Sequence, residues 1–176
     1  METRNKRQGF TLIELMITIA LVAILLSFAG PGFVELIRRN QVRSITDDFY
    51  TAYNTARSEA VKRNQQVTVC ASSDGASCDA DNWDSGWLMF IDENSNGAVN
   101  GGEDVVHKGE ALPGGYTLRA DAPYSSSITM NPDGSVNGIN GSFRVCSDEQ
   151  AADKGRTIRF FSVGRPRLQK GADECP

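Results

Sequence analysis

The sequence contains few of the residues that enzymes most often use for catalysis. It has a single histidine, His107, and no two of its four cysteines have the CxxC spacing of a metal or redox site. His107 stands in the run Val105-Val106-His107-Lys108, which reads as a strand, and no partner nucleophile can be identified for it. A glycine-rich phosphate loop and a histidine-containing metal cluster are also missing. We therefore expect a protein that is not an enzyme and that needs no cofactor.

One long apolar run, residues 10–29, dominates the N-terminal part of the chain. About 20 mostly apolar residues at ~1.5 Å per residue match the ~30 Å hydrocarbon core of a bilayer. The basic residues before it, Arg4, Lys6 and Arg7, favour a cytoplasmic N-terminus. The plausible cleavage site follows Gly9 and so precedes the apolar run, unlike the site of a secretory signal. The sequence predicts a removed leader (1–9), a single transmembrane helix (10–30) and a translocated remainder.

Glu14 places a carboxylate inside this apolar run. Such a charge costs roughly 2.5–3.5 kcal/mol on insertion scales and usually has a partner or a function. Cleavage after Gly9 creates an amine on Phe10, four residues away, which Glu14 can neutralise within the subunit or on a neighbour. The alternative is that Glu14, one turn from the helix end, extends to the membrane interface. We favour the first interpretation, in which the charge pair directs lateral assembly.

Beyond residue 30 the pattern becomes that of an amphipathic helix, with apolar residues at spacings of three or four up to Asn64. Gly30-Pro31-Gly32 should weaken this helix locally. From residue 65 on, short β-type runs alternate with turn residues, which predicts one antiparallel β domain with a single core. The expected fold class is α+β: a long N-terminal helix, transmembrane at first and amphipathic over 31–64, packed on a β domain at 65–176. Strands are expected at 67–71, 86–91, 104–108, 115–119, 127–131, 142–147 and 156–169.

The four cysteines all follow the apolar segment, at Cys70, Cys78, Cys146 and Cys175. An even number in a translocated domain favours disulfides over a metal site. We expect one disulfide between Cys70 and Cys78 and another between Cys146 and Cys175. Four cysteines allow three connectivities, so the other pairings remain open.

The segment Gly9-Phe10-Thr11-Leu12-Ile13-Glu14 resembles the prepilin motif of type IV pilins and type II secretion pseudopilins. The resemblance implies that prepilin peptidase removes the leader after Gly9, that Phe10 is then N-methylated, and that Glu14 is needed for assembly. It also implies a place in the inner membrane before assembly and, afterwards, contacts with other major and minor pilins.

Several later segments are similar to the globular domain shared by GspH pseudopilins and FimT/FimU minor pilins. The similarity implies a minor pilin that primes a type IV pilus or sits at its extracellular tip. A purely structural, GspH-like pseudopilin of a type II secretion system remains the alternative, and the choice among FimT, FimU and GspH stays open. The segments are Trp83, Gly86–Asp92, Asn94, Asn96-Gly97, Ile128–Gly134, Phe143–Cys146 and Gly164–Arg167.

The C-terminal part of the chain is basic although the whole chain has a net charge of −4. Between Ala151 and Lys170 six cations face one acid, Asp153. Gly164-Arg165-Pro166-Arg167 is similar to the Gly-Arg-x-Arg motif associated with DNA capture in FimT-type minor pilins of naturally competent bacteria. The resemblance implies binding of double-stranded DNA without base-specific readout, in support of natural transformation. Alternatively, these arginines only protect an edge strand or contact neighbouring pilins. The DNA-binding candidates are Arg165, Arg167, Lys170, Arg159 and Lys154.

One acidic loop has the spacing of a calcium loop, with Asp92, Asn94, Asn96 and Glu103 as candidate ligands. No helix pair flanks this loop, and the same residues are typical of a hydrogen-bonded turn between two strands. We favour the turn and expect no metal, with calcium as the alternative.

Overall fold

The computed structural model of this chain describes residues 9–79, 82–148, 151, 154–172 and 175. The leader residues 1–8, which the sequence analysis expects to be cleaved off, therefore lie outside the described residues, as does Asp153. The chain divides into two compact units, Met1–Arg38 and Arg39–Pro176. One long helix, α1 (Leu12–Arg63), contributes residues to both units.

In the first unit, α1 exposes its apolar side chains. The large apolar residues from Phe10 to Leu26 are between 52% and 84% exposed. The hydroxyls of Thr18 and Ser27 donate to the carbonyls of Leu15 and Ile24 at 2.8 and 2.7 Å. These polar side chains are thus satisfied within the helix itself, as an apolar environment requires.

Among the described residues, no single helix meets both the length and the apolarity of a membrane span. The segments Leu12–Ser27 and Gly32–Arg63 meet both conditions only together, as a bent pair. The expected weak point at Pro31 falls among residues 28–31, whose side chains lie outside the description.

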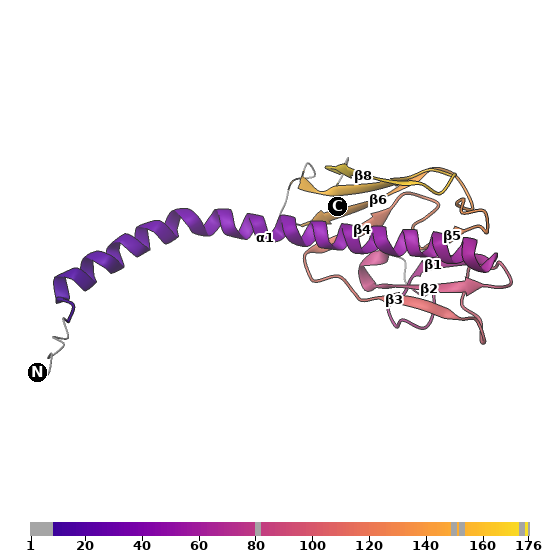
Figure 1. Cartoon of the computed structure of the whole chain (residues 1–176), viewed down its shortest axis with the longest axis horizontal. Helices are drawn as coiled ribbons and strands as arrows, with labels where there is room; N and C mark the ends of the chain where they lie inside the picture. The colour runs from indigo at the N-terminus through magenta and orange to yellow at the C-terminus, as the bar shows by residue number, and fades with distance from the viewer. Residues whose placement is uncertain (1–8, 80–81, 149–150, 152–153, 173–174, 176) are drawn as a thin grey trace, which may run out of the picture. The chain divides into compact units, whose positions relative to one another are not determined.

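The second unit contains two four-stranded antiparallel sheets beside the later part of α1 (Figure 1). A short 3-10 helix, η1 (Trp83–Ser85), precedes β2. The predicted α+β class with a long N-terminal helix and antiparallel sheets is confirmed. The first sheet has the order β3-β2-β1-β5, with β1 (Gln66–Ala71), β2 (Trp87–Asp92), β3 (Val105–Gly109) and β5 (Ser127–Met130). The second has the order β4-β6-β7-β8, with β4 (Tyr116–Ala120), β6 (Gly141–Ser147), β7 (Arg156–Phe160) and β8 (Pro166–Lys170).

The expected single strand at 156–169 is wrong, because this segment forms a hairpin. Phe160 pairs with Pro166, so β7 and β8 run antiparallel on either side of a five-residue turn. Gly164 makes the turn possible with a φ of 75°, and its N–H donates to the carbonyl of Phe161 at 2.7 Å. A left-handed backbone conformation at this point favours glycine.

The core of the second unit lies where α1 meets both sheets. Phe49 of α1 packs edge to face on Trp83, with ring centroids 5.3 Å apart, and tilted on Phe143 of β6 at 4.5 Å. The Trp83 indole N–H donates to the carbonyl of Tyr124 at 3.1 Å. The stripe of α1 that covers the sheets begins at Val42. The earlier apolar residues Phe33, Leu36 and Ile37, which the sequence pattern included in this stripe, are exposed. Buried residues of α1 are Val42, Ile45, Thr46, Phe49, Ala52, Tyr53, Ala56 and Ala60.

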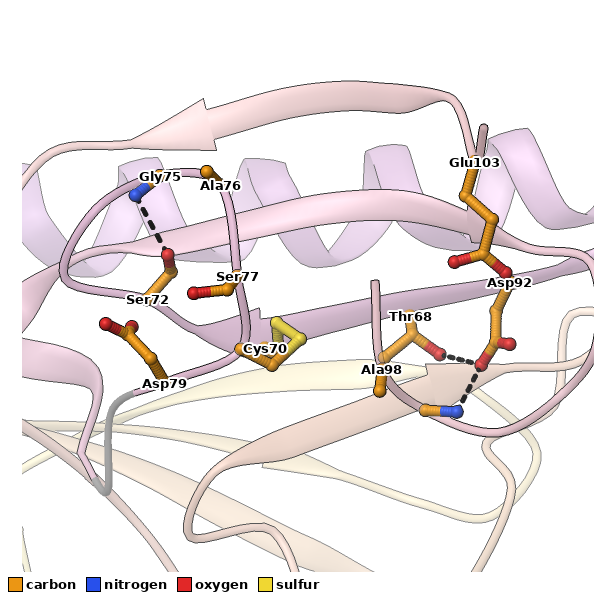
Figure 2. Close-up of a disulfide and its surroundings, with 12 residues drawn as sticks. Thr68, Cys70, Ser72, Gly75, Ala76, Ser77, Asp79, Asp92, Ala98 and Glu103 are labelled. Atoms are coloured by element: carbon orange, nitrogen blue, oxygen red, sulfur yellow. Dashed lines mark hydrogen bonds between the residues drawn. A yellow bond between two sulfur atoms is a disulfide. The ribbon is translucent and has the colours of Figure 1, made fainter. Parts of the chain in front are cut away.

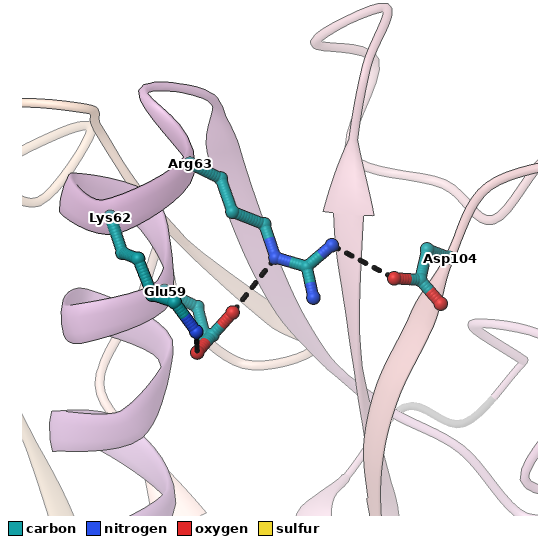
Figure 3. A network of polar contacts seen from close by, with 4 residues as sticks. All are labelled: Glu59, Lys62, Arg63 and Asp104. Carbon is teal, nitrogen blue, oxygen red and sulfur yellow. Dashed lines mark hydrogen bonds and ion pairs between the residues drawn. The ribbon is translucent and has the colours of Figure 1, made fainter.

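The C-terminal end of α1 is tied to the first sheet by an exposed polar network (Figure 3). Arg63 donates from Nε to Glu59 at 2.8 Å and from Nη1 to Asp104, just before β3, at 2.9 Å. The hydrogen bond from Arg63 holds the pKa of Glu59 below its usual value, with Lys62 assisting at 3.3 Å. The network links the last turn of α1 to the first sheet, and the helix ends one residue before Asn64, which adopts a φ of 53°.

Both expected disulfides are present, Cys70–Cys78 and Cys146–Cys175, with Cα atoms 5.6 and 5.8 Å apart. The first closes the loop that follows β1 (Figure 2). In this loop the carboxylate of Asp74 accepts the N–H groups of Ala76 and Ser77 at 2.7 and 2.8 Å. These bonds lower the pKa of Asp74, which therefore stays ionised and organises the loop.

Candidate functional site

The predicted processing site is accessible in the structure. Gly9 and Phe10 precede the first turn of α1, and the Phe10 side chain is 84% exposed. A protease must bind its substrate in an extended form, so this non-helical stretch suits cleavage better than the helix that follows. Cleavage after Gly9 remains a prediction.

Glu14 lies in the first turn of α1 and is exposed. Its backbone N–H donates to Thr11 Oγ1 at 3.3 Å, so Thr11 caps the helix and the spacing from Thr11 to Glu14 is that of a capping box. A capping box accepts glutamate or glutamine equally. Capping therefore explains a polar side chain at position 14 but not a charge.

The basic C-terminal segment forms the hairpin of β7 and β8, which we call the basic hairpin (residues 154–170). Two pairs of like charges lie directly opposite each other in its ladder: Arg159 faces Arg167, and Arg156 faces Lys170. Like charges in directly opposite positions destabilise a sheet. An anion bound between the members of each pair would offset this repulsion.

The two pairs lie on different faces of the hairpin, because side chains alternate along a strand. Ile158 and Phe160 are buried in the core. Arg156 lies two residues before Ile158 in the same strand, so it is on the same, core-facing side of the hairpin. Arg159 has the opposite parity and lies, exposed, on the outer face together with Arg167. The expected single group of five DNA-binding residues is therefore divided: Arg159 and Arg167 belong to the outer face, whereas Lys170 pairs with Arg156 at the far end, next to Lys154.

The turn of the basic hairpin packs closely against the rest of the domain at a glycine. Gly164 is buried, and a Cβ at this position would collide with the carbonyl oxygen of Gly134. Arg57 of α1 donates from Nε to the same oxygen at 2.8 Å, and Val136 donates its N–H to Ser162 at 2.8 Å. The sequence analysis did not identify Arg57 or Gly134 as supports for Gly164-Arg165-Pro166-Arg167.

Ion pairs neutralise part of the outer face on the neighbouring strands. Arg144 of β6 pairs with Asp121 at 2.7 Å, and Arg119 of β4 pairs with Asp84. On the hairpin itself, the guanidinium carbon of Arg167 lies 5.7 Å from the centre of the Phe161 ring, a cation–π distance. Arg165, one residue before β8, is also exposed. The outer face of the β7–β8 hairpin thus carries Arg159, Arg165 and Arg167, and Arg159 takes part in a further interaction.

The acidic loop after β2 turns its carboxylates toward its own backbone (Figure 2). Asp92, only 2% exposed, accepts the N–H groups of Asn96 and Gly97 at 3.0 and 2.8 Å and the hydroxyl of Thr68 at 2.9 Å. Glu103 accepts the N–H groups of Glu93 and Asn100 at 3.2 and 2.8 Å. Over the residues that the structure describes, no group of three or more His, Cys, Asp or Glu residues could hold a metal ion. The hydrogen bonds of Asp92 and Glu103 are those of the expected turn between two strands.

Replacing Asp92 with asparagine should lower the free energy of unfolding by about 1–3 kcal/mol, because an amide cannot replace both acceptor oxygens for the buried donors. Urea unfolding of the parent and the variant, each with calcium and with a chelator, measures this. The neighbouring exposed Glu93→Gln removes the same charge and should have little effect. A calcium-dependent gain in stability that is lost in Asp92→Asn would restore the calcium interpretation.

Two family models match the chain. The model described as "Type II transport protein GspH" matches residues 46–164, and the "Prokaryotic N-terminal methylation motif" matches residues 4–30. The pilin-like protein PilA1 of Thermus thermophilus is 31% identical over 108 residues, which cover 59% of this chain and 62% of PilA1. A fimbrial protein of Moraxella nonliquefaciens is 43% identical over 56 residues, covering 30% of this chain and 36% of that protein. The matches thus span less than two thirds of these relatives.

Solved structures share this fold, among them a minor pilin and a minor pseudopilin. The type IV minor pilin FimU of Pseudomonas aeruginosa superposes with a TM-score of 0.64 at 20% identity, covering 78% of this chain and 97% of FimU. The minor pseudopilin EpsH of the Vibrio cholerae type II secretion system gives 0.52 at 16% identity, covering 74% and 97%. At these identities the likeness concerns the fold alone. Because the GspH family model covers well over half of the chain, and the methylation motif precedes it, this protein belongs to the GspH family and is a non-enzymatic minor pilin or pseudopilin.

Proposed function

We propose that this protein is a minor pilin of a type IV pilus, located at the tip or involved in priming, that binds double-stranded DNA through the outer face of its basic hairpin. The observation that carries the proposal is the ladder pair Arg159 and Arg167, with Arg165 next to it. All three side chains are exposed. Arg167 lies on β8, an edge strand of its sheet, and Arg165 directly precedes that strand, so a large ligand can approach these two side chains from the side as well as from the face. Arg159 lies on β7, the inner strand next to it.

The spacing of these arginines suits a phosphate backbone. A strand advances about 3.3 Å per residue, so Arg165 and Arg167 are about 7 Å apart, within reach of phosphates along one strand of DNA. Directly opposite residues have Cβ atoms about 5 Å apart, which brings Arg159 into the same group. A guanidinium group can bind a phosphate through two parallel N–H···O hydrogen bonds. Such contacts position DNA without reading its sequence.

We further propose the steps that lead to the fibre. Prepilin peptidase removes residues 1–9 after Gly9, and Phe10 becomes the methylated N-terminus. The exposed apolar helix then anchors the chain in the inner membrane by a single span, with the domain after residue 64 in the periplasm. Glu14 pairs with a terminal amine as the subunit joins other major and minor pilins in the extracellular pilus.

Mutation of Arg165 and Arg167 to glutamine should weaken DNA binding and lower the salt dependence of binding by about two in the slope of log K against log salt, since two phosphate contacts are lost. Gel retardation of a DNA duplex by the mature chain in neutral detergent, over a series of salt concentrations, measures both. Arg43→Gln with Lys62→Gln removes equal charge from exposed sites on α1 and should change binding much less. Equal retardation by the two double variants would refute the site.

A structural pseudopilin of a type II secretion system is the second candidate. The description of the matching family as a type II transport protein and the shared fold of EpsH favour it. It predicts no specific loss of DNA affinity on mutation of the hairpin. The retardation experiment therefore separates the two candidates.

A further inference from the structure

A second group of cations surrounds a cavity at the other end of the basic hairpin. The cavity has a volume of about 340 Å³ and is lined by Arg39, Lys154, Gly155, Arg156 and Lys170. Four of these five residues carry a positive charge, and the described lining includes no acid. The cavity is separated from Arg165 by most of β8, about 17 Å along the strand.

The backbone holds these cations in place. Lys154 donates its N–H to Ala151 at 2.9 Å, and Gly171 donates to the carbonyl of Gly155 at 2.8 Å. The hydroxyl of Thr157 donates to the carbonyl of Gly171 at 2.9 Å. The ladder then sets Arg156 directly opposite Lys170. These contacts fix the backbone positions of the three cations of the hairpin, Lys154, Arg156 and Lys170, and Arg39 of α1 completes the lining.

The chemistry of this lining suits a phosphate group. Arginine offers paired N–H donors to phosphate oxygens, and lysine adds a compact point charge. A single phosphate would lie between Arg156 and Lys170 and remove the repulsion between them. Arg39 and Lys154 each take part in a further interaction, so the inference depends on where the four cations converge and not on their lacking partners.

The position of the cavity in the chain indicates the source of the phosphate. Arg39 follows the end of the expected transmembrane segment, residue 30, by nine residues, which span at most about 30 Å even when fully extended. The length of this linker therefore sets an upper limit on how far Arg39 can lie from the membrane while the apolar segment is inserted. The cavity's volume of about 340 Å³ admits a phosphate group such as a lipid headgroup. We propose that Arg39, Lys154, Arg156 and Lys170 bind the phosphate headgroup of an anionic membrane phospholipid.

This site would hold the globular domain at the membrane before assembly. A subunit that leaves the bilayer for the fibre gives up the headgroup, so the site favours the membrane-resident state. Anionic lipids attract such basic groups over a range of about one Debye length, which a site adjoining the membrane segment satisfies.

Calorimetric titration of the mature full-length chain in neutral detergent tests the proposal, with dihexanoylphosphatidylglycerol as the probe. We expect saturable binding that falls at least about tenfold in Arg156→Gln with Lys170→Gln. Arg165→Gln with Arg167→Gln removes the same charge from the other end of the hairpin and should leave lipid binding unchanged. Dihexanoylphosphatidylcholine, which carries no net charge, should bind much more weakly.

Three results would overturn the proposal. Equal losses in the two double variants would mean a diffuse charge effect. Binding of inorganic phosphate as strong as that of the lipid would assign the cavity to free phosphate. Displacement of the lipid by a DNA duplex in the parent but not in Arg165→Gln with Arg167→Gln would make the cavity part of the DNA surface.

Discussion

Replacing Phe143 with alanine should lower the free energy of unfolding by about 3–5 kcal/mol. Phe143 of β6 is completely buried, and its ring centroid lies 4.5 Å from that of Phe49, 5.1 Å from that of Trp83 and 5.6 Å from that of Phe160. The side chain thus joins α1, η1 and the second sheet. Alanine would leave a cavity that three large rings cannot fill without losing their contacts with one another.

Urea unfolding of the mature chain in neutral detergent, followed by tryptophan fluorescence, measures this loss. Ile139→Ala is the matched control, because Ile139 is also large and apolar but is 64% exposed. The control should change stability by no more than about 0.5 kcal/mol. A similar, small effect of both variants would mean that α1 and the sheets do not share one core.

Local patterns in the sequence predicted the helix and most strands. The spacing of Ile45, Phe49 and Tyr53 gave the buried face of α1 because one helical face recurs every three to four residues. Turn residues such as Asn131–Gly134 marked the gaps between strands, since their conformations are set by neighbouring backbone. The cysteine pairs followed from their positions in a translocated domain, although sequence alone left other connectivities open.

The basic hairpin was harder to predict because its features depend on contacts between distant parts of the chain. Position 164 requires glycine because the carbonyl of Gly134, 30 residues earlier, leaves no room for a Cβ. No local sequence pattern contains this contact. Grouping Lys154 and Lys170 with Arg165 and Arg167 relied on closeness in sequence. Strand pairing and side-chain alternation assign them to different places.

The acidic loop shows a different limit of prediction from sequence. Its spacing fitted a calcium loop, but spacing does not say where carboxylate oxygens point. In the structure Asp92 and Glu103 accept backbone N–H groups, a use that the same sequence letters allow equally.

Glu14→Gln should largely abolish incorporation of this subunit into fibres. Glutamine retains the size, the polarity and the capping-box function of position 14, so the helix should still form and insert. It loses only the negative charge, and with it the attraction for a terminal amine in an apolar layer where charges are poorly screened. The variant therefore separates helix capping from charge pairing.

The most direct measurement is the amount of this subunit in sheared fibres relative to the membrane, by quantitative immunoblot of strains that express the parent, Glu14→Gln or Ser27→Ala. Ser27 is a polar residue of the same helix whose hydroxyl is satisfied by the carbonyl of Ile24, so its loss should not change the ratio. We predict that Glu14→Gln reaches the membrane at the parental level but falls at least about tenfold in fibres. Parental amounts of Glu14→Gln in fibres would contradict the proposed charge pair.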